Sequence, residues 1–269
     1  MTSEQLFELI LKTGRENNEI LMIGSEGSRN NPSITPDIYQ DFDITYFVEN
    51  ERFADFKSFN RTMFGEIMIE QILPESNRWC WLMHFMDDNR LDLKIQPISS
   101  VSNYLLADTL NTILLDKTGK YLTLPATSER SHFIKRPNQQ EFDDTINEFF
   151  WLATYVVKGI LRHEFLYATY FFEQHVRLEF YKLLAWHVGI ETDFSISLGK
   201  ANKKLLDYFS ELTQTYDLSS LSKIAFALKF SVNLVINILP NLSQNLQLTY
   251  EFSAVEKTTD YIFRKLKSL

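Results

Sequence analysis

The sequence predicts an α+β protein, with a mixed β-sheet flanked by helices over residues 1–137 and an α-helical bundle over residues 138–269. Short apolar runs separated by polar turns fill the first part, whereas long apolar stripes of helical period fill the second. Between them, residues 121–137 hold two of the seven prolines and few apolar side chains in their middle. We therefore expect two domains that meet near residue 137, because 269 residues are enough to bury two modest cores.

The first domain is expected to begin with a helix and a strand. Residues 4–17 place apolar side chains at helical spacing, with Ser3 in the position of an N-cap. The run EILMIG, which ends at Gly24, indicates a short buried strand. The polar residues 25–40 contain one glycine and two prolines, and they predict a loop or a short turn of helix.

Further strands are expected after this loop. The run DFDITYFVEN at 41–50 alternates so that Asp41, Asp43 and Thr45 share one face. GEIMIEQI indicates another strand. WCWLMHFM and RLDLKIQPI predict a hairpin that turns at residues 87–89.

Helical period dominates the second domain. Six apolar side chains recur at intervals of four and three residues, as on the core-facing side of a helix: Phe142, Ile146, Phe149, Ala153, Val156 and Ile160. The stretches 163–188, 200–216 and 219–238 have the same pattern and are expected to be helices. Glu173 and Arg177 are four residues apart in the first of these, which favours an ion pair on a helix surface.

Composition limits the functional classes. The one cysteine, Cys80, excludes an intramolecular disulfide and fits a reducing compartment. The N-terminal residues lack the features of a signal peptide, and charges interrupt the apolar stretches before the ~20 residues that span a bilayer. We therefore expect a cytoplasmic protein with no membrane partner. The net charge of −8 disfavours duplex nucleic acid and favours cationic partners, either metal ions or polyamine-like substrates.

Three polar features of the first domain form one pattern. Gly27 and Ser28 lie in the loop after the first strand. Asp41 and Asp43 open the next strand, and Asp92 interrupts a later apolar one. Carboxylates two residues apart on a strand repel each other unless a cation lies between them, and Mg²⁺ prefers such oxygen ligands together with substrate phosphates. Each feature alone has an ordinary explanation, as a turn or as solvated carboxylates, but their order favours one common site.

Longer blocks of sequence resemble a known family. The order GS…DxD…D is the signature of the DNA polymerase β-like nucleotidyltransferases. Around and beyond it, six blocks closely resemble the aminoglycoside 6-adenylyltransferases that inactivate streptomycin, in the same order: EGSRNN, YQDFDITYFV, NRLDLKIQPI, IKRPNQQEFDD, NEFFWLATYVVKG and FSISLGK. The resemblance covers nearly the whole chain.

The resemblance implies an enzyme that transfers AMP from ATP to a hydroxyl of an aminoglycoside, the 6-hydroxyl of streptomycin, and so gives antibiotic resistance. The first domain would be its nucleotidyltransferase catalytic domain, and the helical domain would bind substrate and nucleotide. Asp41 and Asp43 would hold two Mg²⁺ ions against the ATP phosphates. Asp92 would hold the catalytic metal and accept the proton of the acceptor hydroxyl as it attacks the α-phosphate.

Four residues are implied to bind the nucleotide. The backbone amides at Gly27 and Ser28, with the Ser28 hydroxyl, would cradle the triphosphate. Arg29 would be a further phosphate contact, with a surface cation as the alternative. Lys158, on the side of its helix away from the apolar stripe, would reach the triphosphate, with a solvated helix lysine as the alternative.

The acceptor is the least constrained part of the interpretation. A polycationic aminoglycoside needs carboxylates in its pocket, and Asp144 and Glu148, with Asp143, lie on or near the helix that opens the second domain. Solvated acids on a helix face fit the same residues. Relatives of this fold also modify other small molecules, proteins and nucleic acids, so a different small-molecule acceptor is the rival interpretation. The sequence indicates neither oligomeric state nor nucleotide preference.

One residue departs from the resemblance. The related enzymes tend to have a small polar residue two places after the third aspartate, whereas this chain has Lys94, on the same strand face as Asp92. The ammonium would either pair with Asp92 and move to an ATP phosphate, or remain on Asp92 and weaken it as base and ligand. The second case would make the chain a catalytically impaired nucleotide-binding module.

Overall fold

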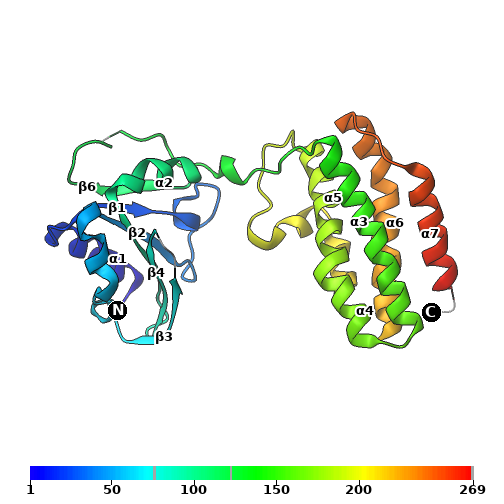
Figure 1. Cartoon of the computed structure of the whole chain (residues 1–269), viewed down its shortest axis with the longest axis horizontal. Helices are drawn as coiled ribbons and strands as arrows, with labels where there is room; N and C mark the ends of the chain where they lie inside the picture. The colour runs from blue at the N-terminus through cyan, green and yellow to red at the C-terminus, as the bar shows by residue number, and fades with distance from the viewer. Residues whose placement is uncertain (75–76, 122, 268–269) are drawn as a thin grey trace. The chain divides into compact units, whose positions relative to one another are not determined.

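The computed structural model (Figure 1) describes the chain in three stretches: residues 1–74, 77–121 and 123–267. It has two compact units, Met1–Ser131 and His132–Leu269. The first contains a six-stranded sheet with helices and the second is helical, which confirms the predicted α+β class. The division between the units comes before the expected boundary at residue 137. The residues in between already belong to the helical unit, where the amide of Ile134 donates to the carbonyl of Ile196 (2.9 Å).

The described part of the first unit contains these helices and strands: α1 (Ser3–Glu16), β1 (Ile20–Ser25), β2 (Phe42–Val48), β3 (Ile67–Pro74), β4 (Trp79–Phe85), β5 (Arg90–Pro97), α2 (Val101–Ala107) and β6 (Thr112–Asp116). Helix α2 and strand β6 were not predicted from the sequence. Helix α1 is capped by Thr2 and not by Ser3 as expected, because the Thr2 hydroxyl accepts from the amide of Gln5 (3.2 Å) and Gln5 bonds back to the Thr2 amide (2.8 Å).

The sheet has the strand order β3-β4-β5-β2-β1-β6. β2 and β5 run parallel, whereas the other neighbouring pairs run antiparallel, including the predicted hairpin of β4 and β5. Helix α1 buries Leu6 and Ile10 in the core formed with β2, β4 and β5. The buried hydroxyl of Tyr46 donates to the carbonyl of Ile10 (2.8 Å), so the helix is held to β2 by a hydrogen bond as well.

The described part of the helical unit contains these elements: α3 (Gln139–Leu161), α4 (Phe165–Phe171), a π-helical turn (Phe172–Val176), α5 (Arg177–Glu191), α6 (Leu221–Leu246) and α7 (Phe252–Lys265). All six side chains of the predicted apolar stripe on α3 are buried. Asn138 and Glu141 form a capping box at its start, which explains why this helix begins at Gln139.

The predicted helix over 200–216 is wrong. Three short 3-10 turns occupy this segment, at Lys200–Asn202, Leu205–Asp207 and Ser210–Thr215. Ala201 and Asn202 both have φ of +56°, a left-handed conformation that a right-handed helix does not accept. An apolar pattern with helical spacing therefore packs here without a continuous helix.

Helix α6 corrects one expectation about membranes. By length and composition it is apolar enough to cross a bilayer, although the sequence suggested that no apolar stretch was long enough. A core helix passes the same test. In this structure, 44% of its most apolar window is buried, and Leu228, Val232 and Val235 belong to the core of the unit.

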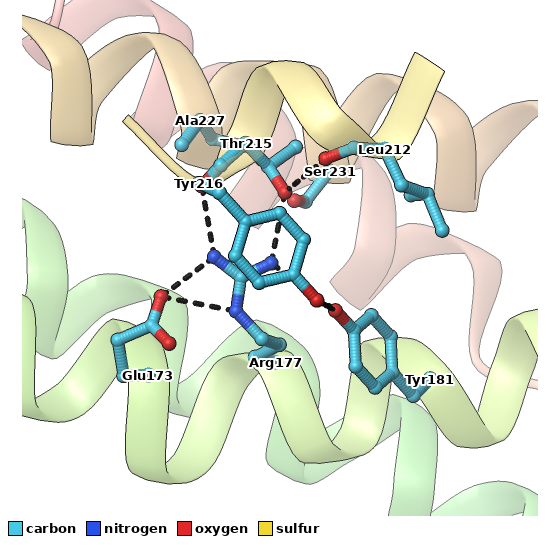
Figure 2. A network of polar contacts seen from close by, with 8 residues as sticks. All are labelled: Glu173, Arg177, Tyr181, Leu212, Thr215, Tyr216, Ala227 and Ser231. Atoms are coloured by element: carbon cyan, nitrogen blue, oxygen red, sulfur yellow. Dashed lines mark hydrogen bonds and ion pairs between the residues drawn. The ribbon is translucent and has the colours of Figure 1, made fainter. Parts of the chain in front are cut away.

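The Glu173–Arg177 pair is not on the surface as the sequence suggested. The Arg177 side chain is only 6% exposed, and its guanidinium donates to the Glu173 carboxylate (2.6 Å) and to the hydroxyl and carbonyl of Thr215 (both 2.8 Å). Figure 2 shows how the ring of Tyr216 covers the guanidinium, 4.1 Å from ring centre to Cζ, while its hydroxyl meets that of Tyr181. This network fastens the irregular segment before α6 to α5.

Candidate active site

Two of the predicted aspartates lie side by side in the sheet. β2 and β5 run parallel, and their register pairs Asp43 with Asp92. Paired residues on neighbouring strands, about 4.8 Å apart, point to the same face of a sheet. Both side chains are half-buried. The structure therefore brings together two carboxylates that are distant in the sequence, as the common-site interpretation requires.

The surroundings of Asp43 disfavour its ionised form. Burial is the largest of the causes that raise the pKa of Asp43 from 3.8 to about 6, and the negative charge of Asp92 is the next. Lys94 acts in the opposite direction, whereas Glu26 and Asp41 add to the increase. A cation beside both strands would relieve this repulsion and restore the ionised carboxylate.

The loop after β1 lies against Asp43. Gly27 has φ of +71°, and a Cβ at this position would be 2.4 Å from Oδ2 of Asp43. Both the backbone conformation and the close approach therefore require glycine. The amide of Glu26 also donates to the carbonyl of Asp43 (3.0 Å). The 3-10 turn Gly27–Asn30, which contains Ser28, thus begins directly beside the paired aspartates.

Arg29 is engaged by its own loop in this structure. Its guanidinium donates to the carbonyls of Gln40 (2.8 Å) and Asp41 (2.9 Å) and to the hydroxyl of Ser3 (3.1 Å). It also stacks on Phe42, 3.7 Å from the ring centre. These contacts hold the turn to the start of β2. The predicted phosphate contact stays a prediction, and the visible role of Arg29 is to position the loop.

Asp41 lies just before β2. Its Oδ1 atom is buried and has no hydrogen-bond partner, and the Nε atom of Arg90 is 3.4 Å away. A buried carboxylate oxygen without a hydrogen bond is costly unless another charge compensates it. Asp41 therefore differs from Asp43, since a positively charged side chain already lies close to it.

Lys94 has a partner that the sequence analysis missed. Its Nζ atom is 2.5 Å from Oε2 of Glu26, whose other oxygen accepts from the hydroxyl of Thr45 (2.6 Å). Thr45 and Lys94 are paired across β2 and β5, two residues along from the two aspartates and on the same face. The sequence analysis considered only Asp92 as a partner for Lys94. Glu26 stands immediately before the Gly-Ser pair, but only the folded loop brings it to β5.

A cavity of about 510 Å³ opens beside these residues. Glu26, Gly27 and Asp43 line one part of it, and α2 contributes Asn103 and Tyr104. The Tyr104 hydroxyl donates to the carbonyl of Ser25 (2.9 Å) and so joins α2 to the end of β1. The volume lies in the range of small-molecule sites, about 300–1,000 Å³. Neither α2 residue carried a signal in the sequence.

The donor set fits a hard divalent cation. Asp43 and Asp92 offer carboxylates whose repulsion a cation would relieve, and Asp41 has the buried oxygen without a hydrogen bond. In the described part of the chain, no group of three or more His, Cys, Asp or Glu is already assembled as a metal site. Mg²⁺ commonly uses only one or two carboxylates and completes its shell with water and phosphate oxygens.

The remaining predicted residues lie in the helical unit. Lys158 is half-buried, and its ammonium lies over the rings of Tyr155 (4.3 Å) and Tyr167 (5.3 Å). Asp144 lines a cavity between α3 and α7, whereas Glu148 is exposed on α3 and does not line it. Their predicted roles in binding triphosphate and acceptor stay predictions.

Comparison with known proteins gives one consistent result. The family model described as Streptomycin adenylyltransferase matches residues 1–265. The chain is 31% identical to an aminoglycoside 6-adenylyltransferase of Campylobacter jejuni, covering 99% of this chain and 96% of the relative. It is 35% identical to the enzyme of that name from Bacillus subtilis, over 81% of this chain and 82% of the relative. A crystal structure of an aminoglycoside 6-adenyltransferase from Bacillus subtilis matches 98% of this chain and 99% of its own, with 28% identity and a TM-score of 0.47.

Paired aspartates on neighbouring parallel strands, under a glycine turn and beside a cavity, agree with these matches. Together they define an enzyme of the nucleotidyltransferase class. The chain belongs to the streptomycin adenylyltransferase family. The family resemblance of the six sequence blocks is thereby confirmed.

Proposed function

We propose that this enzyme transfers AMP from ATP to a hydroxyl group of an aminoglycoside, with Mg²⁺ as cofactor, and that the acceptor is the 6-hydroxyl of streptomycin. The matched family is named for streptomycin adenylyltransferase, and both relatives above are named aminoglycoside 6-adenylyltransferases. The net charge of −8 suits a polycationic acceptor better than it suits a nucleic acid.

The observation that carries the proposal is the pairing of Asp43 with Asp92 on parallel strands. Burial, together with the neighbouring charge of Asp92, raises the pKa of Asp43 to about 6, which is a cost to the folded protein when nothing is bound. An enzyme that binds a divalent cation and a triphosphate there recovers that cost. A protein without such a ligand gains nothing from the arrangement.

Each residue of the site has a separate role in the proposed reaction. The acceptor oxygen forms a bond to the α-phosphorus of ATP, and the bond from that phosphorus to the β-phosphate oxygen breaks, so pyrophosphate leaves. Asp92 accepts the proton of the acceptor hydroxyl. The turn that begins at Gly27 offers backbone amides, with the Ser28 hydroxyl, to the phosphates. Asp43 and Asp92, with Asp41, would hold Mg²⁺, which would neutralise charge on the phosphates.

The impaired-module interpretation loses its main support from the Lys94 contact. That interpretation depended on an ammonium that remains on Asp92. In the structure, the ammonium is 2.5 Å from Glu26, which supplies a compensating charge. The Lys94–Glu26 pair is therefore compatible with a working site.

The test is mass spectrometry of acceptors incubated with the enzyme and ATP. We expect streptomycin to gain one AMP, kanamycin and lincomycin to remain unmodified, and EDTA to abolish the product. Modification of lincomycin but not of streptomycin would contradict the acceptor. Full activity in EDTA would contradict the metal.

A further inference from the structure

A second cavity, of about 670 Å³, lies wholly within the helical unit, between α3 and α7. Its lining includes Ala254 and Thr258 on α7 and Asn147 and Thr154 on α3. Its volume is that of a small-molecule site. Apart from the contribution of Asp144, the site described above does not use it.

The walls of this cavity combine aromatic rings with carboxylates. Trp151 is 58% exposed, which is unusual for the largest apolar side chain, and Tyr250 and Phe150 also line the cavity. Asp143, Asp144 and Glu251 complete the lining, which includes no Lys, Arg or His among the described residues. Open aromatic faces and carboxylates are the two groups that attract an organic cation.

The carboxylates are held in place without a counter-charge. Asp143 accepts from the side-chain amide of Gln139 (2.8 Å), and Asp144 accepts from that of Gln140 (2.8 Å). In the described part of the chain, no basic side chain forms an ion pair with either aspartate or with Glu251. The negative charge at this cavity is therefore uncompensated by the protein.

The segment that contributes Thr249 and Tyr250 to the cavity is held to α3 by hydrogen bonds. Gln139 donates to the carbonyl of Thr249 (2.7 Å) and accepts from the amide of Thr249 (3.0 Å), which ties the segment before α7 to the start of α3. Tyr250 packs edge-on against the buried ring of Phe142, with ring centres 6.4 Å apart. A preformed wall lowers the entropic cost of binding.

We infer that this cavity binds a small organic cation that carries guanidinium or ammonium groups. The indole of Trp151 and the ring of Tyr250 would cover the planar cation, and Asp143 and Asp144 would neutralise it. The identification of this cation with the aminoglycoside acceptor rests on the proposed function, whereas cation binding itself does not.

Calorimetry on the full chain without ATP tests the binding, with agmatine and streptomycin as separate probes. The double variant Asp143→Asn/Asp144→Asn should weaken binding of both probes about tenfold, since each partly exposed ion pair contributes up to ~1 kcal/mol. Trp151→Leu should weaken it about threefold through the lost cation–π contact. High salt should weaken binding of the probes by the wild type and by Trp151→Leu, which keep the carboxylates, more than it weakens binding by the double variant.

Glu256→Gln is the control, because Glu256 is exposed on α7 and does not line the cavity, and its substitution removes one negative charge from outside the cavity. It should bind both probes as the wild type does. Equal binding by the double variant and the wild type, or equal weakening by Glu256→Gln, would overturn the inference.

A parallel measurement of AMP transfer separates this inference from the proposed function. If the double variant raises the KM for streptomycin without changing that for ATP, the cavity holds the acceptor. If streptomycin is modified with an unchanged KM, the cavity is not the acceptor site, so the identification of the cation with the acceptor fails while the proposed function stands. If agmatine binding depends on the aspartates but no acceptor is modified, the proposed function fails and the cation site stands.

Discussion

The two units bury charge in opposite ways. In the helical unit, Arg177 is almost fully buried, and its guanidinium has a carboxylate, a carbonyl and hydroxyls as partners. In the sheet unit, Asp43 and Asp92 lie side by side with like charge, and the pKa of Asp43 is raised to about 6. The first arrangement stabilises the charged side chain, whereas the second disfavours the ionised form of Asp43.

This difference separates a structural charge from a functional one. A buried charge with every partner in place holds elements together, here α5 and the segment before α6. Two half-buried carboxylates side by side disfavour the ionised form of Asp43, and such a pair is expected where a ligand brings positive charge. Substitutions should therefore have opposite signs in the two regions: loss of stability around Arg177, and loss of activity with a gain of stability around Asp43.

The largest expected effect is on turnover at Asp92. Asp92→Asn removes both a proton acceptor, worth about 10²-fold or more, and a ligand for the cation, so kcat should fall by several orders of magnitude. ATP binding should change little, because Asp43 and the turn at Gly27 remain. Steady-state kinetics and calorimetry with ATP measure the two quantities. Near-normal activity would show that another residue accepts the proton.

The largest expected loss of stability is at Arg177. Arg177→Met leaves Glu173 and the Thr215 carbonyl without their partner, so the free energy of unfolding should fall by about 3 kcal/mol. Lys182→Met is the control, because Lys182 is an exposed residue of the same helix and its pair with Glu179 should contribute less than about 1 kcal/mol. Urea unfolding measures both. Similar losses for the two variants would remove the contrast between the regions.

The opposite sign is expected at Asp43. The carboxyl loses its proton near pH 3.8 in the unfolded chain and near pH 6 in the folded one, so the stability of the folded protein falls as pH rises between these values. Asp43→Asn avoids this loss. In EDTA it should be more stable than the wild type by up to about 3 kcal/mol above pH 6, with the difference vanishing as pH falls toward 4.

Urea unfolding in EDTA at pH 8 and pH 4 measures this pH dependence. The exposed Asp55→Asn variant is the control and should change stability by less than about 0.5 kcal/mol at either pH. A destabilised Asp43→Asn at pH 8 would mean that the ionised carboxylate is stabilised in the empty protein.

The sequence predicted the features that depend on neighbouring residues. The β4–β5 hairpin, the apolar stripe of α3 and the glycine turn before the DxD strand all follow from local patterns, and the structure contains each of them. The clustering of Asp43 with Asp92 followed from motif order and family resemblance. The parallel pairing that produces it is a long-range contact, which periodicity alone does not specify.

The features that were missed depend on tertiary contacts. Glu26 meets Lys94 only because the loop after β1 folds onto β5, and Arg177 is buried only because the segment ending at Thr215 covers it. Over 200–216, Ala201 and Asn202 have a left-handed backbone conformation that non-glycine residues seldom adopt, and it interrupts the expected helix. The sequence analysis considered only partners close in the sequence for Lys94 and Arg177. In the folded chain, both side chains also have partners from other elements.

The smallest expected effect concerns Lys94. This residue is paired with an opposite charge, as Arg177 is, and it also lies close to the like charges of Asp43 and Asp92. Its side chain is 16% exposed and is paired with Glu26, while its positive charge also lowers the pKa of Asp43. Lys94→Thr, which puts a small polar residue at this position, leaves Glu26 and Asp43 without this compensation. The pKa of Asp43 should then rise further, so a cation and ATP should bind less well.

We expect Lys94→Thr to raise the KM for ATP and lower kcat, each by less than about tenfold, as for the loss of one hydrogen bond between charged groups. The acid limb of the pH–rate profile should move to higher pH. A merely structural role for Lys94 would not move that limb. Lys94→Arg, which keeps the positive charge, should restore the position of the acid limb.

The double variant Glu26→Gln/Lys94→Thr removes the charge of Glu26 as well and should recover part of the lost ATP affinity and turnover. Faster turnover by Lys94→Thr would instead show that the ammonium competes with the cation for Asp43 and Asp92, and that this chain is an impaired member of its family.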